Sequence, residues 1–233
     1  MESKATVRHT LFNMFKQYFS EILGTVAYHR FLSLLPAQEK MIMAQSPDLD
    51  EWITARSLSV VFAAVDIHIT NQMSDFGFEM GKYFVETFRD EIFMERSVVD
   101  EDSLERLADP ENQLNTGQLR KLDIAELRVY SSSHLPNISR VVKMYGQNLT
   151  KWFRPLEMEI DQRMSGTSFS VILMDRPVKL PLFCEFFMGI LVGFLDNLHI
   201  GEATITKETC LLEGEGACVF SIYYGESSPL DFL

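Results

Sequence analysis

The chain has 233 residues, of which 23% are charged and 46% are hydrophobic, as in an ordinary soluble globular protein. This length suffices for one sizeable domain, or for a core domain with an added helical lobe. The net charge of −12 argues against nucleic-acid binding, because a protein that neutralises phosphates needs a basic surface.

Targeting signals and membrane spans are not expected. The first ten residues carry charges and no apolar run, unlike a secretory signal. The most apolar segment, residues 182–198, is shorter than the roughly 20 residues of a membrane span and contains Glu185 and Asp196. The odd, low cysteine count of three favours a reducing compartment. We therefore expect a cytoplasmic location.

Helices are expected throughout the first part of the chain. Apolar residues recur at spacings of three and four over residues 9–33, and two further helical runs follow at 50–72 and 76–93. Residues 95–118 are polar and acidic and contain Asp109-Pro110, which favours a surface connection. Residues 1–118 are accordingly predicted to form a helical lobe with an acidic connection.

The pattern changes in residues 119–233, where alternating strands and amphipathic helices are expected. The predicted elements are a strand at 125–131, a helix at 137–153, strands at 156–163 and 167–175, a helix at 182–198 that begins at Pro181, and strands at 202–210 and 217–224. The order strand, helix, hairpin, helix, hairpin predicts an α+β fold with an antiparallel sheet covered by helices. The helix-plus-hairpin unit occurs twice, which suggests an internal duplication. We expect this subdomain and the helical lobe to form one integrated domain.

The last hairpin contains two cysteines eight residues apart, separated by a glycine-bearing turn and followed by an aromatic strand. This arrangement, from Cys210 through Gly214 and Gly216 to Cys218 and Phe220, resembles the closing motif of the 4-vinyl-reductase domain. The resemblance covers residues 126–224. Its relatives include sensory domains of aromatic-responsive regulators and transport-particle subunits of vesicle tethering, which implies a dimer.

The same resemblance implies a zinc site. In the aromatic sensors three cysteines and a glutamate hold a structural zinc ion, and Cys184, Cys210 and Cys218 match the cysteine positions here. The position three before Cys210 is Lys207, so Glu208 is the first candidate for the fourth ligand. Three further residues stay open as alternatives, namely Glu185, Glu213 and His199. Three thiolates with one oxygen or nitrogen ligand suit tetrahedral zinc, whereas the alternative is that the cysteines are small buried residues without a metal.

A second, looser resemblance is to the haem-nitric oxide/oxygen (H-NOX) domain. It rests on the helical first half, on residues 80–84 (MGKYF) and on the predicted strand that carries Tyr130. That family holds haem propionates with Tyr-x-Ser-x-Arg, and here the corresponding run is Tyr130, Ser132 and His134. No histidine occurs between His68 and His134, where the proximal histidine should lie. For these two reasons haem is not expected as the cofactor.

Candidate ligand-binding residues come from three segments. They are Tyr130, Ser132 and His134 on one face of a strand, Tyr145 and Trp152 on a helix, and Gly189 and Gly193, which would let a backbone or a flat ligand approach the apolar helix. The 18 phenylalanines and 12 methionines suit an adaptable apolar cavity, although a packed core uses the same residues.

No catalytic motif is legible, so we do not expect an enzyme. The first hypothesis is a sensory domain that binds a small hydrophobic molecule and signals through a homodimer or a partner protein. The second is a dimeric scaffold of the transport-particle type. The third is a haem or other tetrapyrrole binder with non-standard ligation through His134 or a cysteine.

Overall fold

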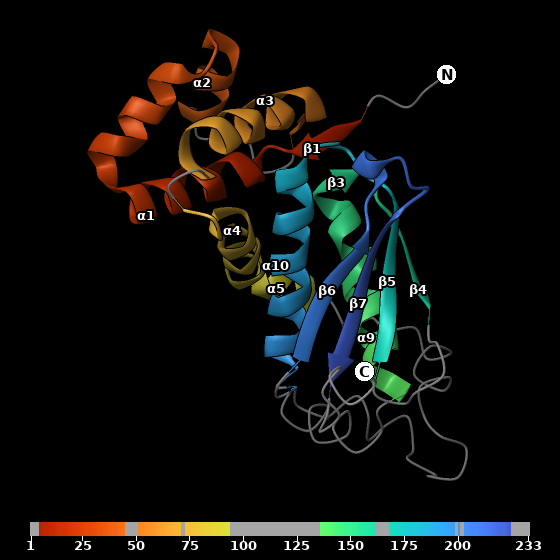
Figure 1. Cartoon of the computed structure of the whole chain (residues 1–233). Coiled ribbons are helices and arrows are strands. Elements are labelled where there is room, and N and C mark those ends of the chain that lie inside the picture. The colour runs from red at the N-terminus through yellow and green to blue at the C-terminus, as the bar shows by residue number, and fades with distance from the viewer. Residues whose placement is uncertain are drawn as a thin grey trace.

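The structure is a computed structural model, and it describes residues 5–44, 51–70, 73–93, 136–161, 168–198, 200 and 203–224. It contains helices and two antiparallel sheets, which confirms the predicted α+β class. In Figure 1 the N-terminal helices gather on one side, and the larger sheet lies on the other with α10 between them.

The elements of the N-terminal half are, in chain order, β1 (Thr6–Arg8), α1 (Thr10–Leu34), α2 (Ala37–Ala44), β2 (Trp52–Thr54), α3 (Ala55–Val65), the π-helix η1 (Asp66–Thr70), α4 (Phe76–Thr87) and α5 (Arg89–Phe93). Those of the C-terminal half are α9 (Pro136–Asn148), the 3₁₀ turn η3 (Leu149–Lys151), β3 (Phe153–Arg154), β4 (Glu157–Asp161), β5 (Ser168–Asp175), α10 (Pro181–Asn197), β6 (Ala203–Thr209), the 3₁₀ turn η4 (Leu211–Glu213) and β7 (Cys218–Tyr224).

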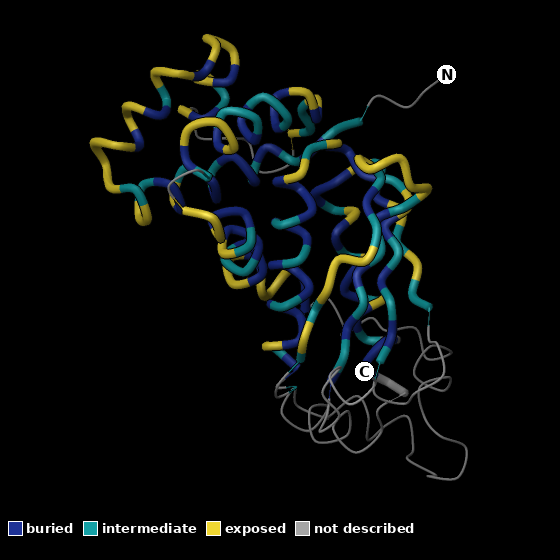
Figure 2. The backbone as a smooth tube through the Cα atoms, viewed as in Figure 1, coloured by how far each residue is buried: buried dark blue, intermediate teal, exposed yellow. Residues whose placement is uncertain are grey.

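The larger sheet has the order β4-β5-β7-β6, with all neighbours antiparallel. Both predicted hairpins are confirmed, since β4 pairs with β5 and β6 pairs with β7. Alternate residues of β5 and β7 are buried, among them Val171, Leu173, Phe220 and Ile222, because they face the helices. Figure 2 shows this alternation along the central strands.

The smaller sheet was not foreseen from the sequence. Strand β1 pairs with β2 through Val7 and Ile53, and with β3 through Val7 and Phe153. It therefore joins the N-terminus to a segment far along the chain. The predicted helix over residues 137–153 is too long, since α9 ends at Asn148 and Phe153 belongs to β3. The predicted helix over 50–72 begins instead with β2.

Two glycines allow α4 and α10 to cross at backbone contact. A Cβ atom added at Gly81 would overlap the carbonyl oxygen of Phe186, and one added at Gly189 would overlap that of Phe78. Gly193 lies against the side chain of Val85 in the same crossing. The apolar segment that begins at Pro181 is thus a helix buried against another helix as well as against the sheet.

Helix α1 contains one break, at Gly24, whose φ of 76° and ψ of 158° are not helical. Residues with a side chain rarely adopt such a positive φ, whereas glycine, which has no Cβ atom, adopts it readily. Before this break α1 buries a phenylalanine-rich face, which includes Phe12, Phe15 and Phe19. Buried side chains from both halves of the chain form one continuous core. The division at residue 118 lies outside the described residues and stays a prediction.

Candidate functional site

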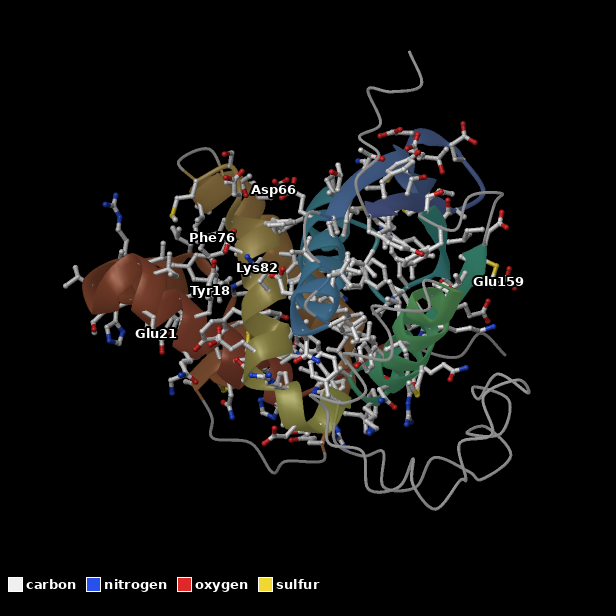
Figure 3. The ribbon with its side chains drawn as sticks, turned by 90° about the horizontal axis from the view of Figure 1, so that it is seen from below. Tyr18, Glu21, Asp66, Phe76, Lys82 and Glu159 are labelled. Carbon is white, nitrogen blue, oxygen red and sulfur yellow. The ribbon has the colours of Figure 1, made fainter. Side chains whose placement is uncertain are left out.

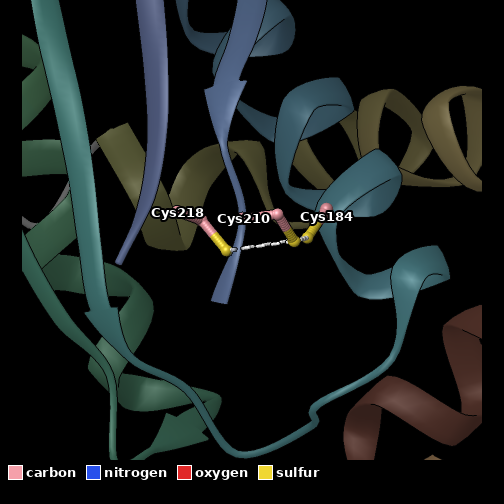
Figure 4. Close-up of side chains that lie close together, drawn as sticks. All are labelled: Cys184, Cys210 and Cys218. Atoms are coloured by element: carbon pink, nitrogen blue, oxygen red, sulfur yellow. Dashed lines mark hydrogen bonds between the residues drawn. The ribbon is translucent and has the colours of Figure 1, made fainter. Parts of the chain in front are cut away.

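Three cysteine sulfurs lie together where the second hairpin meets α10 (Figure 4). The Sγ–Sγ distance is 3.6 Å between Cys184 and Cys210, 3.7 Å between Cys210 and Cys218, and 3.8 Å between Cys184 and Cys218. Each cysteine is at most 1% exposed. The three atoms therefore form a nearly equilateral triangle, which we call the sulfur cluster.

The turn between β6 and β7 positions two of these sulfurs. Gly214 follows η4 with a φ of 89°, a left-handed conformation that glycine adopts without strain, and it reverses the chain so that Cys218 begins β7. The backbone N–H of Leu211 donates to the sulfur of Cys218 at 3.3 Å. The N–H of Leu212 donates to the sulfur of Cys210. Such N–H donors stabilise a sulfur that carries negative charge.

A buried arginine completes the surroundings of the cluster. Arg176 follows β5, is 1% exposed, and donates from Nη1 to the sulfur of Cys184 at 2.7 Å. Burial opposes the charge on the guanidinium, but this hydrogen bond and the charges of the three thiols outweigh it and raise the pKa of Arg176. Its Nε and Nη2 atoms are buried without a hydrogen-bond partner among the described residues. Because a buried cation is costly unless it is paired, the arginine favours negative charge in the sulfur cluster.

The environment shifts two thiols in opposite directions. Burial raises the pKa of Cys184 to about 12, although Arg176 opposes that shift. Burial also acts to raise the pKa of Cys210, but the N–H of Leu212, the neighbouring thiols and Lys207 together bring it below its ordinary value. Of these two thiols, Cys210 is therefore the more acidic.

The triangle has the dimensions of a metal–thiolate site. With a zinc–sulfur bond of about 2.3 Å, two ligands of a tetrahedral ion lie about 3.8 Å apart. The observed edges of 3.6–3.8 Å match one face of that tetrahedron. Among the described residues, the only such group of metal-ligating side chains that comes together is Cys184, Cys210 and Cys218.

The expected fourth ligand does not join this group. Glu208 accepts a hydrogen bond from Thr206 at 2.8 Å and lines a hollow of about 510 Å³ that also contains Ser170 and Ser221. Glu213 lies 3.8 Å from the Nζ of Lys207.

Two further alternatives for the fourth ligand can be placed only in part. Glu185 contacts the first turn of α4 at Gly77, and burial together with Asp66 raises its pKa. His199 lies outside the described residues.

The other expected site residues are dispersed. Tyr145 is 4% exposed and packs edge-on against Phe93 and Phe194, with ring centroids 4.4 Å and 5.3 Å away. Trp152 is fully buried against Phe84 and Phe88, and its Nε1 has no acceptor among the described residues.

The remaining candidates divide between a helix crossing and the undescribed part of the chain. Helix α4 lies in the space beside Gly189 and Gly193. Tyr130, Ser132 and His134 lie outside the described residues.

Comparison with known proteins gives a fold and no family. No family profile matches the sequence, and no curated protein matches it either. Solved structures do match. An H-NOX protein from S. oneidensis in the Fe(II)NO ligation state has a TM-score of 0.52 and 14% identity over 94% of this chain and 99% of its own. Unliganded Fe(II) H-NOX from K. algicida has a TM-score of 0.55 and 10% identity over 94% and 97%.

A third structure, from a study of haem distortion in the H-NOX family, has a TM-score of 0.54 and 12% identity over 95% of this chain and 96% of its own. The chain has an H-NOX-like fold. At these identities the similarity establishes the fold alone. The related structures named here are H-NOX domains, so the resemblance to 4-vinyl-reductase domains and transport-particle subunits stays a prediction.

This result corrects the expectation about haem, which is wrong. Haem was not expected because two short sequence features are missing, the arginine after Tyr130 and Ser132 and a histidine before them. The matching structures share the fold over nearly the whole chain, and their names speak of haem and of Fe(II). The expectation relied on two motif positions alone, whereas the similarity to these structures extends over nearly the whole chain.

Two hollows in the described part of the chain can be compared with what haem needs. One hollow of about 650 Å³ lies between α1 and α4, and the second is the hollow on the sheet that contains Glu208. Neither is lined by a histidine or a cysteine. Since Tyr130, Ser132 and His134 are not described, the residues that the H-NOX resemblance assigns to haem cannot be placed against either hollow.

No helix among the described residues is both long and apolar enough to span a membrane.

Proposed function

We propose that this chain is a non-enzymatic sensory domain that binds a small ligand and signals through a dimer or a partner protein. One observation carries the proposal: the fold matches H-NOX domains over 94–95% of this chain and 96–99% of theirs. A match of that extent involves the whole domain, including both the helical part and the sheet, and not a single shared motif.

Haem is the first ligand to test, since the name of one matching structure refers to haem and that of another to Fe(II)NO ligation. The bound group would supply an iron that takes up a diatomic gas. In this chain His134 is the proposed axial residue, and a cysteine is the alternative. Haem is titrated into the purified chain, and the Soret absorption is recorded for the wild type, for His134→Ala and for His29→Ala, an exposed histidine on α1 that serves as the control.

A saturable Soret shift that is lost in His134→Ala and kept in His29→Ala supports the haem proposal. A shift lost only when a cysteine is replaced by serine assigns the ligation to that cysteine. No saturable shift in the wild type contradicts haem as the ligand.

Native mass spectrometry separates the sensor from the alternative of a dimeric scaffold. A co-purified or exchangeable small molecule supports the sensor. A dimer that carries no adduct, both as isolated and after incubation with haem, favours the scaffold. A chain that stays monomeric at all concentrations contradicts the dimer in both proposals.

The sulfur cluster supports a second and independent proposal, that Cys184, Cys210 and Cys218 bind a thiophilic divalent ion such as zinc. Its edge lengths carry this proposal, and the N–H and guanidinium donors would stabilise the thiolates. Metal analysis compares the wild type with Cys210→Ser. Stoichiometric metal that is lost in the variant supports the site, whereas a wild type without metal after incubation with zinc contradicts it.

A further inference from the structure

A groove between α1 and α4 combines buried aromatic rings with an acidic rim. The groove has a volume of about 650 Å³, within the range of small-molecule sites. We call it the α1–α4 groove. Tyr18, Phe76 and Lys82 line it, and Figure 3 labels these side chains near α1 and α4, together with Glu21.

The base of the groove is aromatic and held in place by the core. The ring of Tyr18 lies 5.2 Å from that of Phe76 and 5.0 Å from that of Tyr83, measured between centroids. Tyr18 is 3% exposed, Phe76 is 1% exposed, and Tyr83 is only partly buried. Tyr83 is therefore the ring of the groove that is open to solvent, and it packs against Tyr18, which in turn packs against Phe76.

The walls add apolar surface that is open to solvent. Ile22 from α1 is 47% exposed, and Met73, just before α4, is 39% exposed, although both line the groove. An organic molecule that covers these side chains would remove apolar area from water, which favours binding at about 25 cal/mol per Å².

The charge of the groove is strongly negative. Three carboxylates line it, those of Asp75, Glu79 and Glu86, against the single ammonium of Lys82. That ammonium already lies 3.8 Å from a carboxylate oxygen of Asp196.

The two tyrosines respond to the same negative field. Burial and then the charge of Glu79 raise the pKa of Tyr18 to about 12. Burial also raises the pKa of Tyr83. The hydrogen bond to Glu21 and the charges of Glu21 and Glu86 raise it further. Both hydroxyls therefore stay protonated, and the rings keep the neutral faces to which cations are attracted.

We propose that the α1–α4 groove is a binding site for an organic cation with an apolar body, such as an aryl- or alkylammonium compound. The carboxylates would attract the ammonium group, the ring of Tyr83 would add a cation–π contact, and Ile22 and Met73 would cover the apolar body. This site goes beyond the proposed sensory function, since it needs neither haem nor the sulfur cluster.

Calorimetric titration of the full chain at low salt with phenethylamine tests the site, with 2-phenylethanol as the neutral analogue of nearly the same shape. Phenethylamine is expected to bind saturably and about tenfold more tightly than 2-phenylethanol, and added salt is expected to weaken it. Glu79→Gln is expected to weaken phenethylamine about two- to fivefold, as for an exposed ion pair. Glu215→Gln, an exposed carboxylate in the turn before β7, is the matched control and leaves the affinity unchanged.

Replacing the ring gives an independent check. Tyr83→Leu is expected to weaken phenethylamine by about two- to fivefold while Tyr83→Phe is nearly neutral, because the ring and not the hydroxyl contacts the cation. Equal affinity for phenethylamine and 2-phenylethanol would overturn the proposal. So would equal effects of Glu79→Gln and Glu215→Gln, or the absence of saturable binding at millimolar phenethylamine.

Discussion

The guanidinium of Arg176 lies 2.7 Å from the sulfur of Cys184, and both side chains are 1% exposed. A buried cation in contact with a cluster of three thiols stabilises negative charge there. Because of this pair, the free energy of unfolding should depend on whether the thiols of the sulfur cluster are protonated, ionised or bound to a metal.

Replacing Arg176 with Met is expected to depend on the charge of the cluster. Where Cys210 is a thiolate, its charge lies one sulfur away from Arg176, so the loss of the guanidinium should lower the free energy of unfolding by about 1–3 kcal/mol, less than the breaking of a direct buried pair. Where all three thiols are neutral, the same change should be nearly neutral or stabilising, because the unpaired Nε and Nη2 donors are removed. Denaturant unfolding at several pH values measures both cases.

The control is Arg56→Met, on the exposed side of α3, which should change stability by less than about 0.5 kcal/mol at every pH. If Arg176→Met gives the same loss at low and high pH, its role is packing and not charge.

The lowered pKa of Cys210 predicts how stability varies with pH. A group whose pKa is lower in the folded than in the unfolded state stabilises the fold above its unfolded pKa, about 8.5 for a thiol. That stabilisation is lost as the pH falls through the folded pKa of Cys210. Thiolate absorbance in the ultraviolet should begin to rise at a lower pH in the folded wild type than in the unfolded chain, and Cys210→Ser should remove this first step. Loss of the same step in Cys184→Ser alone would contradict the assignment, because burial raises the pKa of Cys184.

The crossing of α4 and α10 predicts intolerance to a single methyl group. Gly81→Ala and Gly189→Ala would each place a Cβ against a backbone carbonyl, so the helices must separate, at a cost of about 3 kcal/mol. Gly216→Ala, where a Cβ meets nothing within 4 Å, should cost less than about 0.5 kcal/mol. Thermal unfolding of the three variants decides the matter, and three equal midpoints would show that the helices do not cross so closely.

The buried indole of Trp152 predicts that phenylalanine is tolerated at this position far better than alanine. Its indole N–H is buried without an acceptor among the described residues, so Trp152→Phe removes volume but breaks no hydrogen bond. We expect a cost below about 1.5 kcal/mol for Phe and about 3–5 kcal/mol for Ala. A large loss for Trp152→Phe would indicate that the N–H has a partner, and unfolding curves of the two variants measure this directly.

The hairpins and the long helices could be predicted because their signals are local. Alternating residues such as Val171 and Leu173 specify a half-buried strand within a few positions. The three-residue strand β1 could not be predicted, since its pairing with Phe153 depends on contacts far along the chain. The sequence predicts that α9 ends at residue 153 and not at Asn148, because Trp152 continues the apolar spacing of the helix although it follows the 3₁₀ turn η3.

The candidate site could be predicted only in part. The spacing of Cys210 and Cys218 marks a turn that brings two thiols together, and Cys184 does join them. Arg176 gave no signal, because a charged residue after a strand is usually solvated and its burial is a property of the tertiary structure. The position of Glu208 could not be predicted either, because the face of the sheet on which its side chain lies depends on a register shift between Lys207 and Thr209.

The small sheet determines when, during synthesis, strand β1 can find its second partner strand. Strand β1 precedes β3 by well over a hundred residues in the chain, so one of its edges stays unpaired until Phe153 and Arg154 have been synthesised. Until then that edge of β1 has backbone N–H and C=O groups that are open to pairing with other chains. The helical half is therefore incomplete without the second half, and synthesis of β3 is the step at which that edge is covered.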